Sequence, residues 1–431
     1  NAIDLQQAYN LAKDNDPEYL AAASAYKSSL ESVPQARADL LPTISASTST
    51  TGIDTTVNNY GQYNNNKYKL TLSQPIINYA SWIEYGKAKQ TVRAAHATFS
   101  AAEINLMVRV ADQYFGVLKA VDTLTASNAK RKAFARQLEQ LKEKFKVGLI
   151  AITDVHEAEA KKDIAYAEEI AAKNSLEDQK EIFREIIGKK VKTVTKLKRK
   201  VKLLPPAPNN SETWVVRAEE ENFTLNAAKF NLDVVRRQIS KENSGHLPTL
   251  SLNGNITNNR NTPNTLPNRT VTKEIGLTLT VPLFQSGKVM SKHRQAVYNH
   301  QSAKEQYKEI LRATKSDTRQ SYRGILTQIS RVRALQKAVT SNKSALKATK
   351  AAFDVGTRTV VDVINAESDL IDAEKNYAAA RYDYFLSTLK LKELAGNLAP
   401  ADITYVNGFL VKVMNKNNKV NKNKKSEFKK E

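Results

Sequence analysis

The sequence contains no cysteine, which excludes disulfides, cysteine-ligated zinc and thiol catalysis within its 431 residues. Glycine and proline are scarce, with 14 and 12 copies, so long stretches rich in Ala, Lys, Glu, Gln and Leu favour helix. No run approaches the roughly 20 apolar residues that a transmembrane helix needs. A membrane role therefore has to come from strands. No basic and apolar leader is present, and we expect any export signal to have been removed before Asn1.

The formal charge is +22, which raises nucleic acid and anionic lipid as candidate partners. Much of the excess is local. Residues 189–202 read "KKVKTVTKLKRKVK", and residues 412–431 form a second lysine-dense stretch. The second stretch has no apolar period, and we predict that it is disordered.

Three motifs occur twice in the same order, which indicates a tandem duplication. The second copies follow the first by about 206 to 208 positions. The pairs are "LLPTISAS" and "HLPTLSLN" from residues 40 and 246, "KLTLSQPIIN" and "GLTLTVPLFQ" from 69 and 276, and "FKVGLIAITDV" and "FDVGTRTVVDV" from 145 and 353. We predict a first repeat over 1–202, a second over 203–400, and a C-terminal segment over 401–431.

Each repeat is predicted to contain the same elements in the same order. These are a helix, a β-hairpin, a long helix, a turn containing Val-Gly and a return helix. Period-two alternation marks the strands. The hairpins are expected near 43–77 and 249–284 with polar loops over 53–67 and 255–273, the long helices over 81–144 and 288–352, the turns near 147–153 and 355–361, and the return helices over 154–188 and 362–396.

Four strands leave two open sheet edges, which cannot survive in lipid. Outer-membrane barrels start at about eight strands, so two, three or four copies of the chain could close one. The sheet therefore predicts an oligomer. The residues alone do not choose among these numbers.

These motifs resemble the TolC family of outer-membrane efflux ducts over residues 1–397. The most specific matches are "DQYFGVLKAVDTL", "FKVGLIAITDV", "SGHLPTLSL" and "VGTRTVVDVINA". The resemblance implies a mixed α and β membrane protein, a homotrimer with a 12-stranded barrel in the outer membrane of a Gram-negative bacterium. A 12-helix coiled-coil barrel would cross the periplasm, and a mixed belt would surround it near the mid-chain and C-terminal segments.

The resemblance also implies the function and the partners. The chain is expected to be a passive exit duct for drug efflux and type I protein secretion, gated at its periplasmic end. A periplasmic adaptor protein and, through it, an inner-membrane pump of the RND, ABC or MFS type are expected to open it. No cofactor and no nucleic-acid partner are expected.

The resemblance assigns residues to the gate. Links that hold the helices closed fall on Thr153, Asp154, Phe353 and Arg358. A constriction ring falls on Asp362 and Asn365. Two departures from the family pattern stand out, because Phe353 replaces a tyrosine and Asn365 replaces an acidic residue. The helix tips expected to meet the adaptor are Val147, Gly148, Leu149, Val355, Gly356 and Thr357.

Plainer roles are also open for some of these residues. Asp154 and Asp362 could be N-caps, and Glu157 is placed three residues after Asp154 as a capping box requires. Gly148 and Gly356 are expected to be left-handed residues at helix ends.

Enzyme classes have little support in the sequence. His156 begins "HEAEA", which lacks the second histidine of a zinc site, and no phosphate-loop pattern is present. We therefore expect no catalytic residue and no metal. The alternative function is a basic coiled-coil scaffold or a nucleic-acid-binding protein, which the charge supports but the duplicated hairpins do not.

Overall fold

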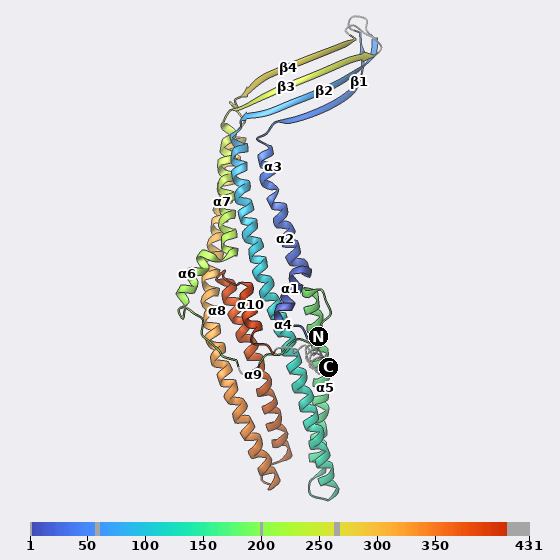
Figure 1. Ribbon diagram of the computed structural model, residues 1–431, viewed down its shortest axis with the longest axis vertical. Helices are drawn as coiled ribbons and strands as arrows, with labels where there is room; N and C mark the ends of the chain where they lie inside the picture. The colour runs from blue at the N-terminus through green and yellow to red at the C-terminus, as the bar shows by residue number, and fades with distance from the viewer. Residues whose placement is uncertain (1, 57–60, 199–200, 263–267, 412–431) are drawn as a thin grey trace, which may run out of the picture. The chain divides into compact units, whose positions relative to one another are not determined.

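The computed structural model describes residues 2–56, 61–198, 201–262 and 268–411 (Figure 1). The chain divides into two compact units. The helical unit comprises residues 1–22, 100–222 and 313–431, and the sheet unit comprises residues 23–99 and 223–312. Each unit takes residues from both predicted repeats, so the repeats are units of sequence and not of packing. The lysine-dense end of the chain, predicted to be disordered, lies outside the described residues.

The sheet unit contains one four-stranded antiparallel sheet in the order β1-β2-β3-β4 (Figure 1). The strands are β1 Thr43–Thr55, β2 Gly61–Ile77, β3 Thr249–Thr262 and β4 Arg269–Thr280. β1 with β2 and β3 with β4 form hairpins, and β2 pairs with β3 to join the two halves of the sheet. β1 and β4 are therefore the two edges.

The expectation of long polar loops was wrong, because most of 53–67 and 255–273 is strand. Polar side chains bond across the ladder there. Thr50 Oγ1 donates to Asn66 Oδ1 at 2.9 Å, and Asn65 Nδ2 donates to Asn261 Oδ1 at 2.7 Å. Cross-strand pairs of this kind stabilise a sheet, so the ladder continues through residues that are usually typical of loops. The middles of the expected loops, 57–60 and 263–267, lie outside the described part.

One face of the sheet is apolar and exposed in the single chain. On β4, Ile275, Leu277 and Leu279 alternate with polar residues and are 78%, 67% and 64% exposed. Ile44 on β1 pairs with Leu72 on β2, Leu72 pairs with Gly254 on β3, and Gly254 pairs with Ile275 on β4. Ile44 and Leu72 therefore lie on the same face of the sheet as Ile275. An apolar face of this kind marks a surface for a membrane or for another chain.

Two helical hairpins carry the rest of the architecture (Figure 1). The long helices are α4 (Tyr79–Lys146) with 68 residues and α8 (Lys288–Asp354) with 67, each about 100 Å long at 1.5 Å per residue. The return helices are α5 (Ile152–Ile187) and α9 (Val360–Leu394). The predicted class, a mostly helical chain with four strands, is confirmed.

An apolar stripe runs along each long helix and is largely buried. Tyr322, Ile325, Ile329 and Val332 are buried on α8, as are Leu138 and Leu141 on α4. Phe145, the next large apolar residue of α4, is exposed. Because α4 ends one residue later, at Lys146, the buried stripe stops at Leu141.

Shorter helices complete the units. They are α1 (Leu5–Asn15), α2 (Pro17–Leu30), α3 (Ser32–Ala38), α6 (Ser211–Glu221), α7 (Phe223–Asn243), a 3-10 turn (Ser244–His246) and α10 (Pro400–Asn407). In the helical unit, aromatic rings of α4 and α9 form the core: Phe115 stacks on Tyr382 at 5.6 Å between ring centroids and on Phe385 at 6.1 Å. Aromatic pairs of this geometry add stability beyond the apolar area that they bury.

Extended segments cross the helical unit between its helices. Val194 forms a parallel bridge with Ile3, and Leu197 forms an antiparallel bridge with Leu410. The hydroxyl of Tyr114 on α4 donates to the carbonyl of Thr195 at 2.8 Å. The chain after α5 is thus held to the N-terminal segment, to α4 and to the residues after α10.

Candidate gate at the helix turns

The two Val-Gly turns have the same backbone construction. Gly148 and Gly356 adopt left-handed conformations, with φ of 75° and 78°. In the first turn, Gly148 N donates to Phe145 O and Leu149 N donates to Lys144 O, at 2.9 and 3.0 Å. Gly356 and Thr357 repeat both bonds on α8. This paired pattern is the Schellman motif, which ends a helix and needs a residue that tolerates positive φ.

Asp154 and Asp362 were expected to be the N-caps of the return helices, but each helix begins before its aspartate. The N-caps are Ala151 for α5 and Thr359 for α9, and both aspartates occupy the third helical position. Ala151 has no side chain that can accept a hydrogen bond, and Glu157 does not complete a capping box. The N-cap interpretation is therefore wrong for both aspartates.

Asp362 nevertheless takes part in a capping box as its acidic partner. Its Oδ2 accepts from Thr359 N and from Thr359 Oγ1, each at 3.0 Å, while Thr359 Oγ1 accepts from Asp362 N at 3.3 Å. The backbone hydrogen bond from Thr359 is the main cause of a lowered pKa at Asp362, followed by the hydroxyl bond, with a smaller contribution from Arg358. A carboxylate held in this way is fixed in place and stays ionised.

Arg358 lies in the turn before α9 with a largely exposed side chain. Its guanidinium is 3.9 Å from Asp362, four residues along the same chain. Within the described part of the single chain, no hydrogen bond or ion pair joins Arg358 to Thr153 or Asp154. An exposed pair at this distance is weak, so the guanidinium can exchange it for another acceptor.

An apolar cluster joins the two hairpins just behind the turns. It contains Ala133, Phe134, Leu138, Leu141, Val155, Ala158, Ala165, Val360 and Ile364, all buried. Phe353 packs against this cluster from α8, and the Lys144 ammonium lies 4.3 Å from the centroid of its ring. Phe353 is thus tied to the first hairpin by apolar packing and a cation–π contact.

Ion pairs bind the first hairpin to the second at several levels. Lys130 on α4 lies 2.7 Å from Asp372 on α9, and Lys119 lies 2.6 Å from Asp383. Burial raises the pKa of Asp372, but the ammonium groups of Lys130 and Lys375 outweigh this and lower it. These partners lie more than 240 positions apart, and no local sequence pattern predicted them.

The remaining predicted residues lie on the surface of the turns. Val147, Leu149 and Val355 expose 69%, 72% and 74% of their surface, and Thr153 and Asn365 are also exposed. Thr357 Oγ1 donates to Ala352 O at 3.0 Å and so braces its own turn. Sequence reasoning missed Thr359, although a threonine three residues before Asp362 is a capping-box signal.

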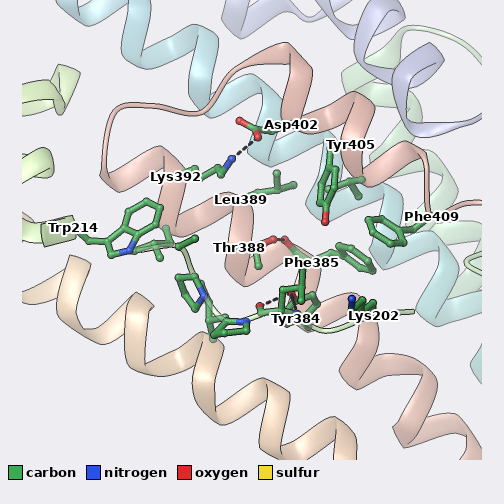
Figure 2. A pocket seen from close by; sticks show the side chains of 17 residues that line it. Lys202, Trp214, Tyr384, Phe385, Thr388, Leu389, Lys392, Asp402, Tyr405 and Phe409 are labelled. Atoms are coloured by element: carbon green, nitrogen blue, oxygen red, sulfur yellow. Dashed lines mark hydrogen bonds and ion pairs between the residues drawn. The ribbon is translucent and has the colours of Figure 1, made fainter. Parts of the chain in front are cut away.

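A separate cavity of about 240 Å³ lies among the extended segment after residue 201, α9 and α10 (Figure 2). Several of its polar groups are paired within the wall. Tyr384 donates its hydroxyl proton to Leu204 O at 2.8 Å and accepts from Leu204 N at 3.0 Å, and Lys392 pairs with Asp402. These contacts fix the extended segment to α9, and none of the predicted gate residues lines this cavity.

Two structural features are absent from the described residues. None of the helices there combines the length and apolar character needed to cross a membrane. No group of three or more His, Asp or Glu side chains in that part of the chain could hold a metal ion.

The chain matches the family model described as "Outer membrane efflux protein" twice, over residues 8–189 and 214–397. It is 38% identical over 415 residues to the outer membrane protein TolC of Vibrio cholerae, covering 95% of this chain and 94% of that protein. It is 26% identical to the alkaline protease secretion protein AprF of Pseudomonas aeruginosa, with 94% and 87% covered. The CmeC outer membrane channel of Campylobacter jejuni shares the fold, with a TM-score of 0.80, 18% identity, and 94% and 90% coverage.

These matches confirm both the resemblance seen in the sequence and the expected outer-membrane location. The chain belongs to the outer membrane efflux protein family.

Proposed function

We propose that three copies of this chain form a passive exit duct whose periplasmic end is closed by the helix turns. The family assignment favours an efflux or secretion duct over a basic scaffold or a nucleic-acid binder. The observation that carries the oligomer is the sheet, with two unpaired edges at β1 and β4 and an exposed apolar face, and the number three comes from the resemblance to the family. Three four-stranded sheets joined edge to edge give a closed barrel of twelve strands, which satisfies every backbone group in lipid.

The gate consists of six helix turns, two from each chain. Arg358 carries a fixed planar charge that can reach acceptors at Thr153 and Asp154 of a neighbouring chain. Its weak pair with Asp362 leaves it available for that exchange. Such links contribute roughly 0.5 to 3 kcal/mol each, which an opening partner can overcome. Phe353 acts by packing, because it lacks the hydroxyl of the family's tyrosine.

The constriction has one acidic ring instead of two. Threefold symmetry brings three copies of Asp362 together, each fixed by its capping box. Asn365 supplies neutral amides at the second position. We expect this entrance to attract cations less strongly than a double ring of carboxylates.

The exposed turn residues suit an adaptor that docks tip to tip. Val147, Leu149 and Val355 present apolar side chains, and a Cβ built on Gly148 or Gly356 meets no atom within 4 Å. The open glycine surface permits close approach by another backbone. The adaptor, and through it an inner-membrane pump, supplies energy that the duct lacks. One relative is named for protease secretion, which supports exported proteins beside drugs as cargo.

The test is single-channel conductance of the purified protein in a planar bilayer without nucleotide. The wild type should conduct weakly. Arg358→Ser combined with Asp154→Ala should raise conductance while the trimer still assembles. Lys146→Ser with Glu143→Ala is the matched control, because it removes an exposed ion pair of 2.6 Å near the first turn.

Two results count against the proposal. Unchanged conductance in an assembled double variant would mean that Arg358 and Asp154 only shape their own turns. ATP hydrolysis by the purified chain alone would contradict a passive duct.

A further inference from the structure

The cavity of about 240 Å³ beside α9 and α10 is larger than the voids that a well-packed core usually contains. Its walls come from α6, α8, α9, α10 and the extended segment after residue 201, all in the helical unit. An engineered apolar cavity of about 150 Å³ holds benzene. A space of this size therefore accommodates one aromatic ring with a short side chain. None of the predicted gate residues lines it, so the proposed gate leaves the cavity unexplained.

One wall of the cavity is a continuous row of aromatic rings from α9, α10 and the residues that follow α10. The ring centroids of Tyr384 and Phe385 lie 5.4 Å apart, those of Phe385 and Phe409 lie 5.3 Å apart, and those of Phe409 and Tyr405 lie 5.1 Å apart. Trp214 from α6 lies at the other end of the cavity (Figure 2). Aromatic rings pack favourably edge-on or offset against one another. The wall therefore suits an aromatic ligand better than a flexible aliphatic chain.

Most of the polar side chains that line the cavity already have a partner. These are Trp214, Tyr384, Thr388, Lys392 and Asp402. The ammonium group of Lys202 and the hydroxyl of Tyr405 have no hydrogen-bond or ion-pair partner among the described residues. Both groups can donate hydrogen bonds. Because Lys392 and Asp402 neutralise each other, Lys202 leaves the cavity with one net positive charge.

We infer that this cavity binds a small aromatic carboxylate. The ring of the ligand packs between Trp214 and the aromatic wall. Its carboxylate accepts from Lys202 and Tyr405, which lie at the same end of the cavity as Phe409 (Figure 2). Hydrogen bonds between charged groups are stronger than neutral ones, so the carboxylate gives the site its selectivity. A cationic ligand would meet Lys202 and find no free carboxylate, since Asp402 is already paired.

The test is tryptophan fluorescence of the full-length protein in lipid nanodiscs, where no free detergent competes for the cavity. The chain has two tryptophans, and Trp82→Phe leaves Trp214 as the reporter inside the cavity. Titration with 3-phenylpropanoate should change the emission saturably, with a Kd on the order of 1 mM or below. The neutral isostere 3-phenylpropanamide should bind about fivefold more weakly, because it cannot form the ion pair with Lys202.

Two substitutions in the Trp82→Phe background test the proposed anion contacts. Lys202→Gln should weaken binding of 3-phenylpropanoate about fivefold and leave binding of the amide unchanged. Tyr405→Phe keeps the ring and removes the hydroxyl, so it should weaken binding of the carboxylate by about threefold. Neither side chain has a polar partner to lose in the described part of the chain. Lys190→Gln is the matched control, because Lys190 is exposed after α5 and does not line the cavity.

Four results would overturn the inference. They are the absence of a saturable change in the wild-type trimer, equal binding of the acid and the amide, equal loss of binding in Lys202→Gln and Lys190→Gln, and tighter binding of octanoate than of 3-phenylpropanoate. The site does not depend on the proposed duct. Particle mass is measured on the same samples, and a wild-type chain that forms no trimer contradicts the proposed function whatever the titration shows.

Discussion

The hydroxyl of Tyr382 on α9 donates a 2.6 Å hydrogen bond to Asp122 on α4 and so joins the two helical hairpins. Burial, followed by the negative charge of Asp122, raises the pKa of this tyrosine. The phenol therefore stays protonated and keeps donating throughout the physiological range. Asp122 also lies 3.8 Å from Lys196, so the same carboxylate supports the extended segment beyond α5.

Replacing Tyr382 by Phe should lower the free energy of unfolding by about 1 to 2 kcal/mol, because a partly buried carboxylate loses its donor. Denaturant unfolding of the detergent-solubilised protein measures this change. Tyr405→Phe is the control, since that ring is exposed, and its effect should stay within about 0.5 kcal/mol. Equal effects of the two substitutions would show that the hydrogen bond to Asp122 contributes nothing to the free energy of unfolding.

The second prediction concerns the turn at Gly356. Substitution by Ala should weaken the local stability of the turn by about 1 to 2 kcal/mol, because φ is 78° there. Gly356→Asn should cost less, since asparagine tolerates the left-handed region. Amide hydrogen exchange over residues 350–364 measures local opening. Ala and Asn variants that exchange equally fast would mean that backbone conformation is not the reason for the glycine.

The pH dependence of the entrance follows from Asp362. Its pKa is lowered by the hydrogen bonds from Thr359, so the carboxylate remains charged as pH falls through the ordinary range of an aspartate, near 4. Cation preference of the channel should therefore persist at pH values where a free aspartate is half protonated, and disappear only at lower pH. Thr359→Ala should move that loss to higher pH. An unshifted titration in this variant would remove Asp362 from the selectivity step.

Topology can be tested with single cysteines, because the native chain has none. Cysteine at Asn64, exposed on β2, should react with an impermeant maleimide on intact cells. Cysteine at Val355 should react only after the outer membrane is permeabilised. Labelling at Val355 in intact cells, without labelling at Asn64, would reverse the orientation of the chain.

The repeated elements could be predicted from sequence because their signals are local. Scarce breakers defined the long helices, and the glycines at 148 and 356 marked the helix ends. The strand ends were missed because their Asn and Thr residues are typical of loops. Only the neighbouring strand, as in the bond between Asn65 and Asn261, shows that these side chains have partners.

The position of the gate could be predicted from the sequence, but the contacts of its residues could not. The motif around Arg358 located the turn, whereas the partner of Arg358 in the single chain is Asp362, in the first turn of the following helix α9. Ala151 at an N-cap gives no chemical signal, so the start of α5 was assigned to Asp154. Pairs such as Lys130 with Asp372 depend on which helices lie side by side, which a sequence of exposed charges does not specify.

The most direct test of the account is the molecular mass of the detergent-solubilised particle, corrected for bound detergent. Three chains of 48.0 kDa predict 144 kDa. Because the open edges at β1 and β4 must pair, this species should persist on dilution in mild detergent. A stable particle at the mass of one chain, with the sheet still folded, would contradict the trimeric duct.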